Sequence, residues 1–352
     1  PGGTPSRCCE ARGVTSTSDL PWVDPGAFEV APGVHRVPLP LPNDGLRAVN
    51  VYVISTDDGL VCVDAGWGIP ESRELFEKAL ASLGAGLPDV RRFLVTHVHR
   101  DHYTQAVHVR RDAGAHVALG LGEKRTLDAL QDVERTPLNG QVTALREAGA
   151  TELADLIDAW FQKQKADPHN WESPDEWLTE GPVDLGTRTL HAVETPGHTA
   201  GHLVFHDLDA RLLFAGDHVL PTITPSIGFE PVLSENPLGA FLRSLAVVRS
   251  RPDAMLLPAH GPVTESAHAR VDALLAHHDG RLDETERAVR GGATTVFEAA
   301  SALRWTRREH RVADLDPFNA MLAVFETGAH LDLLVAQGRL ALRRESGLKT
   351  YS

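Results

Sequence analysis

Cysteine, basic residues and long hydrophobic runs are all scarce in this chain of 352 residues. Only three cysteines occur, with Cys8 and Cys9 in a polar segment and Cys62 in an apolar one, so no disulfide framework is expected. No apolar run approaches the roughly 18 to 20 residues that span a bilayer. No succession of basic, apolar and small residues marks a secretory signal. We therefore expect a cytoplasmic protein without a membrane partner.

Positive charge is also in deficit, because 34 Lys and Arg stand against 48 Asp and Glu, a formal net charge of −14. Such a charge works against non-specific attraction to nucleic acid, although it leaves room for a local basic patch. The hydrophobic fraction of 42% and the length suit one large globular domain, or a core domain with a smaller one. A small molecule is the expected partner, and a homo-oligomer stays open.

The chain divides into three parts by composition. Residues 1–20 are rich in Gly, Pro, Ser and Thr and predict a flexible tail. Residues 21–264 form an α/β pattern, predicted as the main folded domain. Its strands are expected at 50–55, 59–66, 91–96, 116–120, 188–198, 202–207, 211–217 and 253–261, and its first helices at 70–86 and 101–115. Two blocks of strands separated by helices predict two β-layers with helices outside.

Two segments have a helical pattern. Residues 121–180 predict a helical insertion, which either forms a lid over a site or decorates the surface. Its aromatic residues favour a pocket wall: Trp160, Phe161, Trp171 and Trp177. Residues 265–352 predict several helices and then a hairpin around Ser346-Gly347, which is the order of a winged-helix module.

The heptapeptide "THVHRDH", residues 96–102, concentrates metal-binding side chains directly after a predicted strand. His97 and His99 alternate along an extended segment, so both can point to one side. Asp101 and His102 follow where the chain turns into a helix. Imidazole and carboxylate together suit zinc, iron or manganese.

Three later segments repeat the pattern of an apolar strand that ends in a histidine or aspartate beside glycine. These are "ETPGHTAGH" with His198, "LFAGDHV" with Asp217 and "LLPAHG" with His260. A single histidine is usually a surface or core residue. The repetition, together with the first cluster, indicates a site for two metal ions.

These motifs resemble those of the metallo-β-lactamase-fold superfamily, with "HVHRDH", "PGHTAGH", "GD" and "PAHG" in order and "VDAG" at 63–66. The resemblance covers about residues 30 to 264 and implies an αββα sandwich with two divalent ions, zinc by default and iron or manganese as alternatives. The implied ligands are His97, His99 and His198 for one ion and Asp101, His102 and His260 for the other, with Asp217 bridging and Asp64 orienting a ligand.

The chemistry that the resemblance implies is hydrolysis by a metal-bridging hydroxide, since two cations lower the pKa of a shared water. Asp101 is the expected catalytic residue that orients this nucleophile. Asp217 and the lack of cysteine after Cys62 disfavour a true β-lactamase, and His99 disfavours the flavin-linked di-iron oxygen reductases. The pattern is most similar to glyoxalase-II-like hydrolases of thioesters, esters or lactones.

Two other functions stay open. A phosphodiesterase or ribonuclease would use the C-terminal part to bind nucleic acid, yet residues 265–352 hold 12 Lys and Arg against 13 Asp and Glu. The arginines there are typical of a solvated face: Arg304, Arg307, Arg308, Arg311, Arg343 and Arg344. A non-catalytic metal-binding or scaffold protein predicts a missing ligand, whereas all seven are present.

Four further histidines have roles that the sequence leaves open. His202 either supports the site or is structural, and His218 is expected to be structural or solvent-facing. His277 and His278 are expected to serve packing or helix capping.

Overall fold

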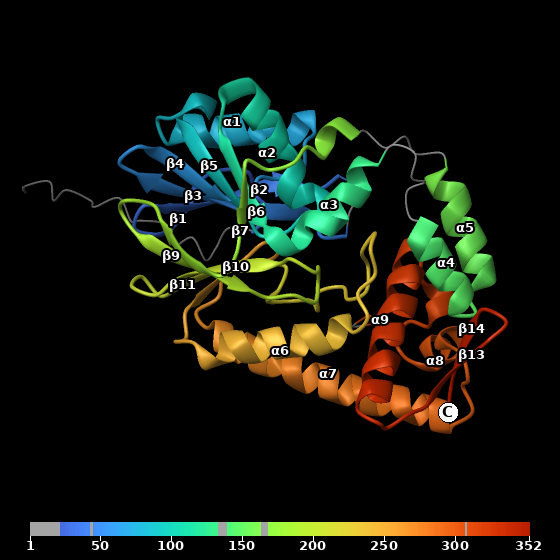
Figure 1. The fold of residues 1–352 in the computed structure, drawn as a ribbon. Coiled ribbons are helices and arrows are strands. Elements are labelled where there is room, and N and C mark those ends of the chain that lie inside the picture. Colours follow the sequence, from blue (N-terminus) through green and yellow to red (C-terminus); the bar gives the residue numbers. More distant parts are fainter. Residues whose placement is uncertain (1–21, 43–44, 133–138, 163–167, 307) are drawn as a thin grey trace, which may run out of the picture.

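The computed structural model describes residues 22–352 except 43–44, 133–138, 163–167 and 307 (Figure 1). The predicted tail at 1–20, with Cys8 and Cys9, lies outside the described residues, as does Arg307.

A seven-stranded sheet forms the first β-layer, with its strands in chain order from β1 to β7. The strands are β1 Phe28–Ala31, β2 Val34–Pro40, β3 Ala48–Thr56, β4 Gly59–Val63, β5 Val90–Val95, β6 His116–Gly120 and β7 Glu176–Leu178. The first four strands pair antiparallel, and β4 to β7 pair parallel. Strands β4 and β6 are nearly continuous apolar runs, and the last three residues of β5 are buried and apolar, as expected of parallel strands covered on both faces.

A five-stranded sheet of order β12-β11-β10-β9-β8 forms the second β-layer. Its strands are β8 Gly181–Asp184, β9 Thr189–Glu194, β10 Leu203–Asp207, β11 Leu212–Gly216 and β12 Met255–Pro258. The two sheets pack face to face through an apolar layer in which the rings of Tyr52 and Phe214 meet edge to face at 5.4 Å. The predicted strand blocks thus become the two layers of one sandwich.

Helices cover both outer faces of this sandwich (Figure 1). The first sheet carries α1 Pro70–Ser82 and α2 Arg100–Ala113, and the second carries α6 Pro237–Ser250 and α7 Ala267–Arg290. The order helix, sheet, sheet, helix agrees with the αββα architecture that the resemblance implies. Single-turn helices lie at Leu87–Asp89, Leu121–Glu123, Pro168–Asn170 and Val312–Asp314.

The predicted insertion contains α3 Lys124–Gln131, α4 Asn139–Glu147 and α5 Thr151–Phe161. Helices α4 and α5 pack against α9 Pro317–Ala336 and share its apolar core (Figure 1). The ring of Trp160 lies 6.5 Å from that of Phe318 on α9. Trp171 and Trp177 instead pack against the core beneath the first sheet's helices. A lid role for this insertion stays a prediction.

The C-terminal part continues with α8 Val296–Ala302 and ends in the hairpin of β13 Leu342–Glu345 and β14 Leu348–Tyr351. The predicted hairpin is confirmed: Ser346 and Gly347 turn it with φ values of 52° and 83°, the positive pair that a type I′ turn requires. Because α7 starts as a covering helix of the second sheet, the C-terminal part is continuous with the sandwich. The winged-helix assignment stays a prediction.

Helix α9 corrects the expectation that no apolar segment reaches the length of a membrane span. Its 20 residues meet that requirement by length and composition, and it is the one such helix among the described residues. Most of its apolar stretch is buried inside the molecule, as in the core helix of a globular domain.

Candidate metal centre

Each predicted ligand follows the carboxyl end of a strand. Strand β5 ends at Val95, just before the 96–102 segment, and helix α2 begins at Arg100, which places Asp101 and His102 in its first turn. In the second sheet, the ligands follow β9, β11 and β12. The seven predicted ligands thus come together, from both sheets, in two adjoining groups.

The first group consists of three imidazoles and Asp217. His99 Nδ1 lies 2.9 Å from His97 Nε2 and 3.1 Å from His198 Nε2. Tetrahedral zinc, with Zn–N bonds of about 2.0–2.1 Å, separates its nitrogen ligands by roughly 3.3 Å. The three nitrogens are therefore nearly at the spacing of a metal site.

The second group consists of Asp101, His102 and His260. His260 Nε2 lies 3.4 Å from Asp101 Oδ2 and 3.3 Å from Asp217 Oδ1. The other oxygen of Asp217, Oδ2, lies 3.5 Å from His198 Nε2 in the first group. Asp217 thus turns one oxygen toward each group.

The outer nitrogens of three imidazoles are fixed by oxygen atoms that can only accept hydrogen bonds. Nδ1 of His102 lies 2.9 Å from Asp64 Oδ2, that of His198 lies 2.8 Å from the Ser226 carbonyl, and that of His260 lies 2.8 Å from the Ala48 carbonyl. Each Nδ1 therefore carries a hydrogen, so Nε2 is the nitrogen that faces the centre and can ligate a cation.

Asp64 supports both groups from outside. Its carboxylate is buried and accepts from the Thr96 amide at 2.8 Å and the Thr96 hydroxyl at 2.9 Å, in addition to His102. Thr96 Oγ1 in turn lies 3.0 Å from His97 Nδ1. Asp64 has a φ of 60°, a left-handed conformation that Asp and Asn adopt more readily than most residues.

Three atoms at the centre are buried without a well-formed hydrogen bond, although the last two lie 3.3 Å apart: His102 Nε2, His260 Nε2 and Asp217 Oδ1. Leaving such atoms unsatisfied costs about 1–3 kcal/mol each. Nitrogen and carboxylate oxygen together are the donor set that suits zinc, iron or manganese. The residues present therefore fit divalent cations.

The electrostatics differ between the two groups. Burial, and next the neighbouring His198, lower the pKa of His99 to about 3, so its imidazole is neutral and able to ligate. Burial alone would lower the pKa of His102, but the surrounding carboxylates outweigh it and raise that pKa to about 9. A cation bound at the second group would displace this proton from His102 and balance the negative charge of the carboxylates in its place.

His202 contacts the centre, which the sequence had left open. Its Nε2 accepts the backbone N–H of Asp217 at 3.1 Å, its Nδ1 lies 2.9 Å from Thr195 Oγ1, and its ring stacks on His97 with centroids 5.0 Å apart. His218, in contrast, is buried against Phe241, so the structural expectation fits and the solvent-facing one is wrong.

Two buried glutamates that the sequence analysis missed hold the loop that carries His198. The Thr199 hydroxyl donates to Glu123 Oε1, and the Ala200 amide donates to Glu230 Oε1 at 2.9 Å. Burial raises the pKa of Glu123 to about 8 and that of Glu230 to about 7. A lone glutamate in "LGLGEK" has the pattern of a surface residue, so no signal could have identified it.

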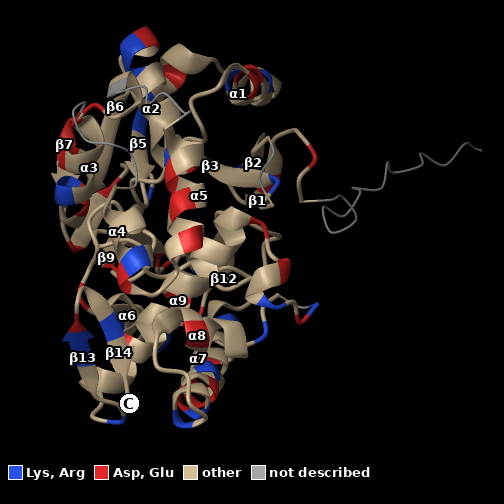
Figure 2. Cartoon of the chain, turned by 90° about the vertical axis from the view of Figure 1, so that its right-hand side faces the viewer, with Lys and Arg blue, Asp and Glu red and all other residues tan. Residues whose placement is uncertain are grey.

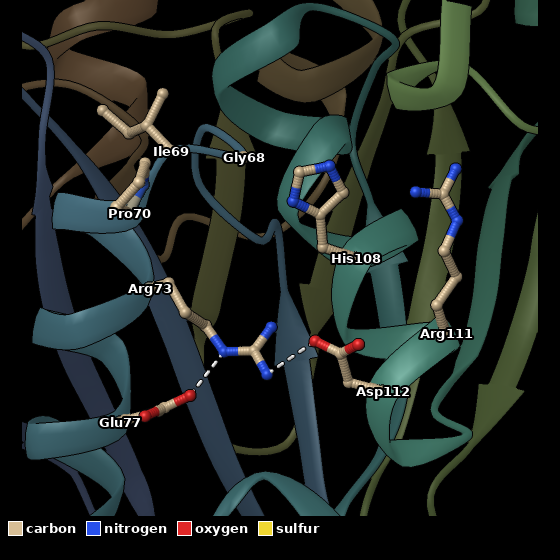
Figure 3. Close-up of a pocket in the computed structure, with 8 residues that line it drawn as sticks. All are labelled: Gly68, Ile69, Pro70, Arg73, Glu77, His108, Arg111 and Asp112. Atoms are coloured by element: carbon tan, nitrogen blue, oxygen red, sulfur yellow. Dashed lines mark hydrogen bonds and ion pairs between the residues drawn. The ribbon is translucent and has the colours of Figure 1, made fainter.

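A separate pocket of about 470 Å³ lies between α1 and α2, on the outer side of the first sheet (Figure 3). Arg73 pairs there with Glu77 at 2.5 Å and with Asp112 at 3.0 Å, so its charge is balanced within the pocket. His108 lines the same pocket, and its Nε2 lies 2.7 Å from Asn170 Oδ1. The lining includes none of the seven predicted ligands.

Comparison with known proteins agrees with this geometry. The family model described as the metallo-beta-lactamase superfamily matches residues 44–260. The chain belongs to this superfamily. Its members' fold implies divalent metal binding, and together with relatives named as hydrolases it identifies the chain as a metal-dependent hydrolase.

Three similar proteins illustrate the range of this superfamily. An atrochrysone carboxyl ACP thioesterase, nsrC of Aspergillus novofumigatus, is 25% identical over 86% of this chain and 80% of its own length. The probable metallo-hydrolase YqjP of Bacillus subtilis is 24% identical over 86% of this chain and 91% of its own. The crystal structure of a beta-lactamase domain protein from Burkholderia ambifaria is 26% identical, covers 96% of both chains and has a TM-score of 0.77.

Proposed function

We propose that this superfamily member is a dinuclear metal-dependent thioesterase that hydrolyses an acyl thioester. The observation that carries the dinuclear part is the position of Asp217, whose Oδ1 lies 3.3 Å from His260 Nε2 and whose Oδ2 lies 3.5 Å from His198 Nε2. One carboxylate that faces two groups of ligands is the arrangement expected of a bridge between two cations. Zinc is the proposed metal, because imidazole and carboxylate are its usual ligands.

When bound, two divalent cations would supply Lewis acidity toward the thioester carbonyl and lower the pKa of a water molecule. Other residues of the chain fix the orientation of the metal ligands. Asp64 fixes His102, and the carbonyls of Ser226 and Ala48 fix two further imidazoles. Asp101 is partly exposed, with 14% of its side chain accessible, so it can contact a substrate or orient water while it faces His260.

The thioester preference draws support from the relative named as an acyl-carrier-protein thioesterase and from exposed apolar residues close in sequence to the segments that contact the His198 loop. Two segments contact that loop: residues 121–123, through Glu123 and Gly122, and residues 226–230, through Ser226 and Glu230. Each is accompanied by exposed large apolar side chains: Leu121 (47% exposed), Ile223 (41%) and Leu233 (45%). We propose that these apolar side chains contact the acyl chain of the substrate.

The test is a side-by-side assay of zinc-loaded protein on an acyl thioester and on a phosphodiester. We expect thioester turnover that is lost in the double variant Asp101→Ala, His102→Ala and that is unchanged in His116→Ala, an exposed histidine on β6. Turnover of the phosphodiester alone would overturn the proposal and favour the nuclease alternative.

The substrate side is tested separately with Leu233→Ser. If the apolar surface binds the acyl group, KM for a long-chain thioester should rise about tenfold while KM for an acetyl thioester stays constant. An equal change for both substrates would contradict an acyl-binding role.

The nuclease alternative gains no support from the surface of the C-terminal part. Arg304, Arg308 and Arg311 are exposed, as expected of a solvated face. Acidic and basic residues are interspersed along α7 (Figure 2), where Arg281 pairs with Glu284 and Arg290 with Glu286. A continuous positive surface, which phosphate binding needs, is not formed by these helices.

A further inference from the structure

We propose that the chain has a further divalent-metal site, apart from the catalytic centre, between α7 and α9. Its ligands are His277 and His278 on α7 and Glu326 on α9, whose ligand atoms all lie within 4.8 Å of one another. The two helices contact each other where they cross in the C-terminal part (Figure 1).

A chain of hydrogen bonds determines which nitrogen of His278 is free to ligate an ion. His330 Nδ1 lies 2.7 Å from the Glu326 carbonyl, which can only accept, so His330 Nδ1 carries the hydrogen and its Nε2 is an acceptor. His278 Nδ1, at 3.2 Å from that Nε2, must then donate. The lone pair of His278 is consequently on Nε2, which is fully buried and has no hydrogen-bond partner.

Burying a nitrogen without a hydrogen-bond partner lowers the stability of the fold by about 1–3 kcal/mol. A cation bound to that nitrogen would remove this cost. Burial, and next the neighbouring His330, lower the pKa of His278 to about 2, so the imidazole stays neutral at ordinary pH. His277 is exposed and Glu326 is partly buried, which gives an ion access from solvent. His278 is therefore a buried ligand, whereas His277 and Glu326 can be reached from solvent.

The cation Arg281 lies near this group and would oppose a second positive charge. Its guanidinium is already engaged, however, with Glu284 at 2.9 Å, with the Arg304 carbonyl at 3.2 Å, and over the Trp305 ring at 4.5 Å. The carboxylate of Glu326 supplies a negative charge within the group itself.

Two imidazoles and one carboxylate are the ligand set of zinc sites that keep a position for water. The ligand atoms would have to close to roughly 3.3 Å, the spacing around tetrahedral zinc, which rotation of the exposed His277 and of Glu326 allows. A bound ion would join α7, which covers the second sheet, to α9, the central helix of the C-terminal part. Its consequence is therefore stabilisation of the C-terminal part, not turnover.

The test counts zinc in untagged, full-length protein by plasma mass spectrometry after gel filtration, with affinities from calorimetric titration of zinc alone. We expect the variant His277→Ala, Glu326→Gln to bind one zinc fewer than the wild type and to show a smaller zinc-dependent rise in its thermal midpoint. The variant Asp101→Ala, His102→Ala, which removes ligands of the catalytic centre, should lose further zinc on introduction of His277→Ala, Glu326→Gln into it. Equal zinc content and equal thermal shifts in the wild type and the α7–α9 variant would overturn the proposal, whatever the protein's activity.

Discussion

The catalytic centre and the α7–α9 histidine group both combine imidazoles with a carboxylate, yet they are supported differently. In the catalytic centre, the outer nitrogens of His102, His198 and His260 are each fixed by a separate oxygen acceptor. In the α7–α9 group only His278 is oriented in this way, through His330, and His277 is exposed. Ligands held in place before binding pay less entropy when the ion arrives. The catalytic centre should therefore bind zinc more tightly.

The largest effect on the catalytic centre is expected from Asp217→Asn, which removes the negative charge that faces both groups of metal ligands. Because an amide offers one acceptor oxygen instead of two, we expect the second metal to be lost and thioester turnover to fall by about 10²–10³-fold. Zinc content and steady-state kinetics measure the two effects. Asp209→Asn, an exposed aspartate before β11, is the matched control and should behave as the wild type.

Gly216→Ala breaks the packing that surrounds the catalytic histidines. A Cβ at this position would lie 2.7 Å from both His202 Nε2 and Thr96 Oγ1, and the φ of 50° is unfavourable for alanine. We expect the free energy of unfolding to fall by about 3 kcal/mol, measured by denaturant titration.

The matched control is Gly280→Ala on α7, where a Cβ would meet nothing within 4 Å. Alanine favours a helix interior over glycine, so this variant should be more stable by about 0.5–1 kcal/mol. Equal changes in the free energy of unfolding for Gly216→Ala and Gly280→Ala would contradict the difference in packing around these two glycines.

Asp64→Asn tests how much of the catalytic centre's affinity comes from its outer support. Asparagine tolerates the left-handed backbone at this position, so the change is confined to the carboxylate that accepts from Thr96 and His102. Loss of such an outer acceptor lowers metal affinity or activity about 10–100-fold. Competition with a chelator gives the affinity, and an unchanged value would show that Asp64 only shapes the fold.

Glu123→Gln should flatten the pH dependence of stability. The folded protein holds a proton on Glu123 up to a pKa of about 8, whereas the unfolded chain releases it near 4.5. The folded state thus binds more protons between these values, and stability is lost as the pH rises through this window. Between pH 6 and 8 the wild type should lose on the order of 1–2 kcal/mol that the neutral amide retains. The control is Glu152→Gln, which changes an exposed glutamate. Its stability should depend on pH in the same way as that of the wild type.

The smallest effect is expected at the C-terminal hairpin, where Arg344 pairs with Glu147 at 3.2 Å with 59% of its side chain exposed. Arg344→Ala should lower the free energy of unfolding by about 0.2–1 kcal/mol and leave thioester turnover unchanged. A large loss of stability in thermal melts would show that the hairpin anchors α4 more firmly than a surface pair can.

The sequence contains most of the information on the ligands, because they occur in short motifs after apolar strands. His97, His99, Asp101 and His102 lie within six residues, so local pattern alone brings them together. Alternation and apolar runs likewise predict most strands of the sandwich. The short edge strands β1, β7 and β8 were missed because three or four residues give too little pattern, and the seven-residue β2 was missed as well.

The supporting contacts could not be predicted, since they depend on atoms that every residue carries or on distant segments. The acceptors of His198 and His260 are the backbone carbonyls of Ser226 and Ala48. Because every residue has such a carbonyl, the sequence does not show which one accepts the hydrogen bond. The packing of α4 and α5 against α9 joins segments more than 150 residues apart along much of their length. Only the folded chain shows these relations.

The ligands are shared between the two sheets, and this has a practical consequence. Residues 97–102 follow a strand of the first sheet, whereas His198, Asp217 and His260 follow strands of the second. No single half of the chain contains the whole centre. The metal content of a preparation would therefore report the fraction of molecules in which both halves have joined correctly, and it would serve as a quality measure during expression, refolding or storage.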